Sequence, residues 1–177
     1  MKERTKMKVA ALSTLLCLLT IAQASNNYFR VPNTSVSYRV SREKTGENNS
    51  SIFLDDSSKK STITIACFNY APIFYITVPE KILTQQQARD SIIPDLYIRA
   101  DSAKKVGRFE AAAVGDEATT DFNTIGGWEN DQQIVSLMLS EKKSVTVQFK
   151  VVTGKYVRYT FPTAGLASTF KLLRNCK

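Results

Sequence analysis

Apolar and polar residues alternate most regularly near the end of the chain, in "SVTVQFKV" (144–151) and "YVRYTF" (156–161). A period of two is typical of a β-strand with one buried face. The pattern places Val145, Val147 and Phe149 toward a core, and Tyr159 and Phe161 on the returning strand. The intervening "VTGK" has turn composition, so the two stretches predict a β-hairpin.

Two further hairpins are indicated upstream. In "TITIACF" (62–68) the residues Ile63, Ile65 and Cys67 share one face, and "PIFYITV" (72–78) is apolar on both faces, as in a central strand. "DLYIRAD" (95–101) and "KKVGRFEAA" (104–112) predict the second pair. The segment 79–94 is expected to be a loop, although "LTQQQARDSI" within it could form a helical turn, and 113–130 is expected to be a long surface connection.

Two helices complete the expected fold. Asn130 or Asp131 is a suitable N-cap for a short helix near 131–139. Beyond Pro162, with Thr163 as the expected N-cap, four residues at steps of four, three and three lie on one apolar helix face: Leu166, Phe170, Leu173 and Cys176. The prediction is a mainly β protein, an antiparallel β-sandwich or rolled sheet with the C-terminal helix docked on the sheet.

Domain organisation follows from a change of composition near residue 60. Residues 25–60 are mostly polar and are interpreted as an N-terminal extension with one or two short strands. Residues 61–177 then form a single β-rich domain closed by the C-terminal helix.

The first 24 residues have the three parts of a secretory signal peptide. "MKERTKMK" is basic, "VAALSTLLCLLTIA" (9–22) is apolar, and Ala22 and Ala24 stand at the small-residue positions of a cleavage site before Ser25. The 14-residue apolar run is shorter than the roughly 20 residues that span a bilayer. We therefore expect cleavage between Ala24 and Ser25, a periplasmic or secreted product, and no transmembrane span after processing.

Removal of this leader changes the charge. It holds four of the 24 Lys and Arg residues and one of the 16 Asp and Glu residues, so the net charge falls from +8 to +5. The mature chain has neither a basic helix nor a basic stripe interleaved with aromatic residues, which argues against nucleic-acid binding.

The mature chain keeps two cysteines, Cys67 and Cys176. In an exported protein an even count indicates a disulfide, and two cysteines allow only one pairing. Both lie on faces expected to be buried, so a bond between them would tie the terminal helix to the sheet. The alternative is a pair of buried free thiols.

Residues suited to catalysis are scarce. The chain has no histidine, which excludes His-based triads and His metal ligands. Two carboxylate pairs, Asp55–Asp56 and Asp116–Glu117, are interpreted as solvated loop charge rather than catalytic pairs. Neither a phosphate-binding glycine loop nor metal-ligand spacing is present. No enzyme activity and no cofactor are expected.

The polar face of the last hairpin is the candidate surface for a protein partner. It carries Lys150, Lys155, Tyr156 and Arg158, although a solvated sheet face would have the same residues. Trp128, the only tryptophan, is either a binding anchor on a loop or a cap over one end of the core.

The C-terminal sequence "FPTAGLASTFKLLRNC" (161–176) resembles a motif of small exported bacterial β-sandwich proteins that end in a helix with a final cysteine. It is similar to the periplasmic accessory proteins encoded with type VI secretion systems, and more distantly to the invasion-associated locus B group. The latter usually has a further cysteine pair, which this chain lacks. The resemblance does not cover residues 25–60, and neither group supplies catalytic residues.

These observations give two functional hypotheses. The first is a non-enzymatic accessory or protein-binding module of the bacterial envelope, with a protein partner there and a role in secretion implied by the resemblance. The second is an exported inhibitor or an interaction factor that acts on a host or competitor protein, encoded with virulence genes or on a mobile element. The oligomeric state and the partner's identity stay open.

Overall fold

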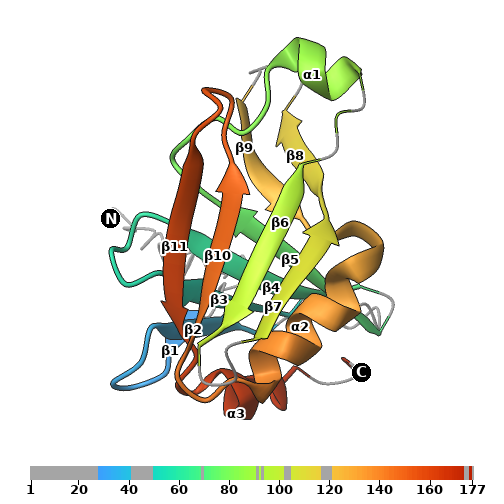
Figure 1. Ribbon diagram of the computed structural model, residues 1–177. Coiled ribbons are helices and arrows are strands. Elements are labelled where there is room, and N and C mark those ends of the chain that lie inside the picture. Colours follow the sequence, from blue (N-terminus) through green and yellow to red (C-terminus); the bar gives the residue numbers. More distant parts are fainter. Residues whose placement is uncertain are drawn as a thin grey trace, which may run out of the picture.

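The computed structural model describes residues 28–40, 50–68, 70–90, 92, 94–101, 105–116, 121–173 and 176 (Figure 1). The expected signal peptide and its cleavage site, Ala24 and Ser25, lie outside the described residues. The fold is mainly β, as predicted, and consists of two antiparallel sheets. Within the described residues, no helix is both long and apolar enough to cross a bilayer.

The larger sheet has seven strands in the order β1-β2-β3-β4-β5-β9-β8. Their bounds are β1 Tyr28–Arg30, β2 Val36–Arg39, β3 Ser51–Asp55, β4 Thr62–Phe68, β5 Ala71–Thr77, β8 Ala112–Asp116 and β9 Asp121–Gly126. The predicted hairpin of β4 and β5 is confirmed, and β5 is an inner strand. Ile63, Ile65 and Cys67 face the core together, as their alternation indicated.

The smaller sheet has the order β11-β10-β6-β7. Its strands are β6 Asp95–Ala100, β7 Lys105–Glu110, β10 Ser144–Lys150 and β11 Tyr156–Pro162. Both predicted hairpins of this sheet are confirmed, β6 with β7 and β10 with β11. The fully buried Val145, Val147, Phe149 and Phe161 belong to one core cluster with the isoleucines of β4.

The helices are short. They are α1 Gln85–Arg89, the 3₁₀ turn η1 Trp128–Asn130, α2 Asp131–Ser140 and α3 Leu166–Phe170. The predicted helix near 131–139 is α2, whose N-cap is Asn130. The Asp131 carboxylate accepts a hydrogen bond from the Phe74 N–H at 3.1 Å, which ties α2 to β5. Figure 1 places α3 at one end of the molecule, where it contacts β2 and β3.

Residues 25–60 contribute three strands rather than one or two. The third, β3, is the "IFL" segment, and it pairs with both β2 and β4. Val36, Ile52 and Leu54 of β2 and β3 are fully buried. The polar loops around these strands lowered the apolar content of the segment, although its few apolar residues lie in the core.

Two segments expected to lack regular structure are ordered. Within 79–94, Thr84 and Gln87 form a capping box that starts α1. Within 113–130, β8 and β9 form a hairpin, and β9 pairs with β5. The glycines and polar residues of this segment do not form an alternating strand pattern. The strand that β9 pairs with, β5, lies in a distant part of the chain.

The C-terminal segment also differs from its prediction. The N-cap of α3 is Gly165, in the left-handed region at φ 85°, rather than Thr163. The Thr163 hydroxyl instead donates to the Glu141 carbonyl. The helix ends at Phe170, so Cys176 lies beyond it rather than on its face, and Phe170 is only partly buried.

Candidate functional site

The candidate partner surface lies on the outer face of the β10–β11 hairpin. Lys150 on β10 stands opposite Tyr156 on β11, and Arg158 stands opposite Gln148. Lys155 lies in the turn before β11. All four predicted residues are exposed, and Tyr156 keeps 59% of its surface accessible. We call these four residues the hairpin face.

The hairpin face carries positive charge that is not neutralised. Arg158 donates from Nε (3.2 Å) and Nη2 (2.7 Å) to the Gln148 side-chain oxygen, which holds the guanidinium against the sheet without cancelling its charge. Among the described residues, neither Lys150, Lys155 nor Arg158 takes part in an ion pair. A rigid hairpin therefore presents three cations around an exposed tyrosine ring.

The other half of the same sheet face differs in its electrostatics. Arg108 on β7 donates from Nε and Nη2 to both carboxylate oxygens of Asp95, each at 2.9 Å. This hydrogen bonding raises the pKa of Arg108 above its usual value. Arg99 likewise pairs with Asp101 at 3.1 Å. Arg99 and Arg108 are thus neutralised on this face, unlike the three cations of the hairpin face.

Trp128 is not part of the hairpin face. It belongs to η1, which contacts β7, and β7 and β11 are the opposite edge strands of the smaller sheet. The structure therefore separates this residue from the other four candidates by the width of that sheet.

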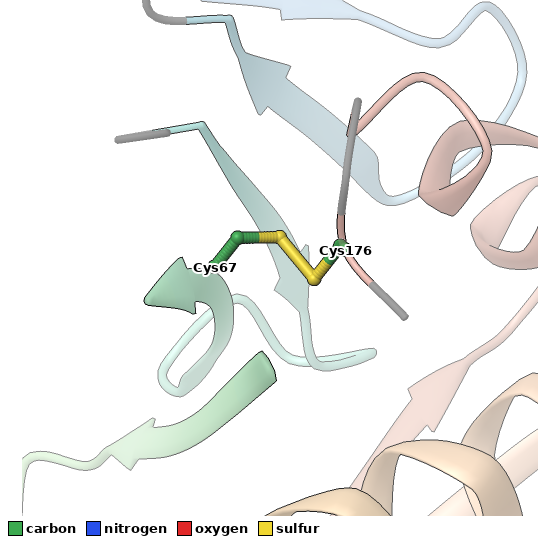
Figure 2. The surroundings of a disulfide bond; sticks show 2 residues. All are labelled: Cys67 and Cys176. Carbon is green, nitrogen blue, oxygen red and sulfur yellow. A yellow bond between two sulfur atoms is a disulfide. The ribbon is translucent and has the colours of Figure 1, made fainter. Parts of the chain in front are cut away.

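The predicted disulfide is present. Cys67 near the end of β4 and Cys176 beyond α3 have their Cα atoms 5.7 Å apart and are 109 positions apart in sequence. Figure 2 shows the bond joining the strand to the C-terminal segment. Cys67 is 4% exposed. The bond is a structural tie, although it holds the chain after the helix rather than the helix itself.

Asp56, which was predicted to be a solvated loop carboxylate, is buried and accepts hydrogen bonds from its own loop. Asp56 is 4% exposed, and its Oδ1 accepts from the N–H groups of Lys60 (2.7 Å) and Ser61 (2.8 Å). Its Oδ2 accepts from the N–H and hydroxyl of Ser58. Burial raises the pKa of Asp56, but these hydrogen bonds outweigh it and hold the pKa below its ordinary value.

Tyr159 makes the second unusual polar contact inside the protein. Its ring stacks against Phe149 with centroids 6.4 Å apart, and its hydroxyl donates to the Glu80 carboxylate. Burial, followed by the hydrogen bond to Glu80, raises the pKa of this phenol. The contact joins β11 to the segment after β5 and is structural, because both groups satisfy each other.

Sequence reasoning missed a cleft at the point where the chain passes from β7 to β8. It has a volume of about 630 Å³. Its apolar lining, here called the floor, is Leu83, Ala88, Ile92, Phe109, Ala111, Ala112 and Ala113, and the more exposed polar residues Arg108, Glu110, Glu129 and Asn130 form its rim. We call it the β7–β8 cleft. The available signal was the run "EAAA" at a strand end, since small side chains leave room beside an edge.

Metal-ligand groupings are absent from the part of the chain that the structure describes: no three Asp, Glu or Cys side chains converge there. Comparison with protein-family models, with curated proteins and with solved structures returned no match to this chain.

Proposed function

We propose that this protein is an exported, non-enzymatic accessory module of the bacterial envelope that acts by binding another protein through its hairpin face. The observation that carries the proposal is the set of three unneutralised cations around exposed Tyr156. Tyrosine and arginine are among the residue types enriched at protein interfaces. Positive charge on a rigid surface attracts a partner with an acidic patch and orients its approach.

Export to an oxidising compartment is part of the proposal. A disulfide persists in such compartments and is rare in the reducing cytosol. The three-part N-terminus and the C-terminal resemblance to secretion-associated periplasmic proteins support the same location. The partner is accordingly sought in the envelope, and a role beside a secretion system is the specific form of the hypothesis.

The first experiment identifies the partner. A photo-crosslinking amino acid replaces Tyr156 in the full-length protein expressed in its own cells, with exposed Gln133 on α2 as the control position. We expect an envelope protein with an acidic surface to crosslink at position 156 and not at position 133. Crosslinks only to a protein of a host or competitor cell, offered in the same assay, would instead favour the alternative hypothesis of an exported interaction factor.

The second experiment measures affinity with the purified partner. Tyr156→Ala and Arg158→Ala should each weaken binding by about tenfold, the effect of losing roughly 1.4 kcal/mol. Gln133→Ala should leave it unchanged, and all three variants should keep the wild-type melting temperature because the side chains are exposed. Equal affinity for all variants would reject the hairpin face as the interface.

A panel of cell-wall, ester and glycoside substrates tests the non-enzymatic part of the proposal. We expect no turnover from the same protein preparation. Turnover that a single Asp, Glu or Ser substitution abolishes in a correctly folded variant would overturn the proposal.

A further inference from the structure

The β7–β8 cleft has the dimensions of a binding site. Its volume of about 630 Å³ falls within the range of roughly 300–1,000 Å³ that ligand sites occupy. Four of its lining residues are alanines: Ala88 of α1, and Ala111, Ala112 and Ala113 where the chain enters β8. Side chains this small leave space. Ile92 in the same lining is 49% exposed.

The rim of the cleft is negatively charged. Glu110 and Glu129 are exposed, and within the described residues neither takes part in an ion pair. Arg108 is held by both oxygens of Asp95, and Glu110 contributes only the weakest attraction to it. Two carboxylates therefore remain available to a cation beside an apolar floor.

The backbone next to the cleft favours an extended ligand. β8 is the outer strand of the larger sheet, and it pairs only with β9. The N–H and C=O groups of successive strand residues point to alternate sides, so one of Ala112 and Ala113 bonds to β9 and the other faces outward. Just before them, the Ala111 N–H donates to the Pro94 carbonyl at 3.1 Å, and the Glu110 carbonyl accepts from Asn130 at 3.0 Å. An added chain would thus pair with one residue at the start of β8, as in strand addition to a sheet edge.

We propose that the β7–β8 cleft binds an extended peptide segment of a partner protein that carries a lysine or arginine side chain. The aliphatic stem of that side chain lies on the alanine floor, and its charged end reaches Glu110 and Glu129. The free edge of β8 aligns the peptide backbone. This site is separate from the hairpin face, whose charge has the opposite sign, and it does not depend on the function proposed there.

The test uses the oxidised mature protein and four fluorescent pentapeptides of the form Ala-Val-X-Val-Ala with blocked ends, where X is lysine, arginine, norleucine or glutamate. Anisotropy titrations should show saturable binding of the lysine and arginine peptides. The norleucine peptide should bind about three- to tenfold more weakly, since exposed ion pairs contribute little each. The glutamate peptide should bind most weakly. Amide shifts in NMR spectra should centre on Ala112 and Ala113.

Variants locate the site. The double substitution Glu110→Gln with Glu129→Gln should lower affinity for the lysine peptide to that of the norleucine peptide, while Asp55→Asn, which removes a charge from distant β3, should not. The proposal is overturned if no peptide saturates, if the glutamate peptide binds as tightly as the lysine peptide, or if the double variant binds both as the wild type does.

Discussion

Asp56 shows how one side chain organises a whole loop. Its two oxygens accept four hydrogen bonds from residues 58–61, so they hold the turn between β3 and β4. Lys59 in this turn has a positive φ of 57°, which a non-glycine residue adopts only when its surroundings hold it. The same turn also contacts the smaller sheet, because Ser57 donates its N–H to the Thr160 carbonyl of β11.

We predict that Asp56 makes the stability of the fold depend on acid pH. Its pKa is lower in the folded chain than its ordinary value of 3.8, so its contribution is present above that value and disappears as the pH falls through the folded pKa. Asp56→Asn places an NH₂ group against the Ser58 donors and should cost about 1–3 kcal/mol near neutral pH. Denaturation from about pH 6 to about pH 2 should show this difference shrinking. A constant difference would rule out a role for the charge.

A second prediction concerns the aromatic residues of the smaller sheet. Phe149 is fully buried and stacks on Tyr159, whereas Tyr156 on the neighbouring strand faces solvent. Phe149→Ala should lower the free energy of unfolding by about 3–5 kcal/mol, and Tyr156→Ala by less than about 0.5 kcal/mol. Urea denaturation measures both. Phe170→Ala should fall between them, because that ring is only partly buried.

At the scale of elements, the junction between β11 and α3 depends on one glycine. Gly165 has φ 85°, and a Cβ there would come within 3.1 Å of the Thr34 methyl carbon and 3.4 Å of the Val31 side chain. Gly154 in the β10–β11 turn has a similar φ of 82°, but the nearest atom to its Cβ would be 3.8 Å away. The two sites therefore differ in crowding and share their backbone conformation.

We predict that Gly154→Ala costs about 1–2 kcal/mol, the penalty of a left-handed conformation, and that Gly165→Ala costs clearly more. The additional loss of stability in Gly165→Ala comes from crowding between α3 and the turn at 31–34. The cost of the left-handed backbone is common to both variants, so the difference between their free energies of unfolding, measured by chemical denaturation, gives the cost of crowding. Equal losses of stability in the two variants would mean that the turn at 31–34 moves to accommodate the added methyl group without cost.

At the scale of the whole molecule, the disulfide joins the first half of the larger sheet to the end of the chain. It closes a loop with a sequence separation of 109 residues. The segment between the two cysteines contains all four strands of the smaller sheet and the helices α2 and α3. A constraint over so much of the chain reduces the entropy of the unfolded state more than it affects any local contact.

We predict that the double substitution Cys67→Ser with Cys176→Ser lowers the free energy of unfolding by up to about 4.7 kcal/mol, the chain-entropy value for a loop of this size. Treatment of the wild type with a reductant should give the same result, and it should not affect the double variant. Intact mass before and after reduction and alkylation checks the bond directly. Two alkylatable thiols in the native protein would contradict the structure.

The sequence by itself determined the strands that bury one continuous face. In β4 and β11 alternate residues are buried, since successive side chains of a strand point to opposite sides, and in β10 the outward Thr146 is buried as well as its apolar neighbours. The exposure of Tyr156 and Arg158 followed from the same rule. The cysteine pairing followed as well, because removal of the expected signal peptide, which contains Cys17, leaves two cysteines and one possible pairing, and both lie in apolar patterns.

Tertiary structure alone decided the features that depend on distant partners. The β8–β9 hairpin is held by pairing with β5, and the edge of β8 beside α1 creates a cleft that no local pattern encodes. The end of α3 at Phe170 is likewise seen only in the structure. Helical spacing favoured a longer helix, but the N–H groups of Leu172 and Leu173 bond to carbonyls three residues back, as in a turn. Cys176 is then bonded to Cys67, which lies 109 positions away in the sequence. Such contacts contribute free energy only once the whole chain has folded, so a residue's neighbours in sequence do not reveal them.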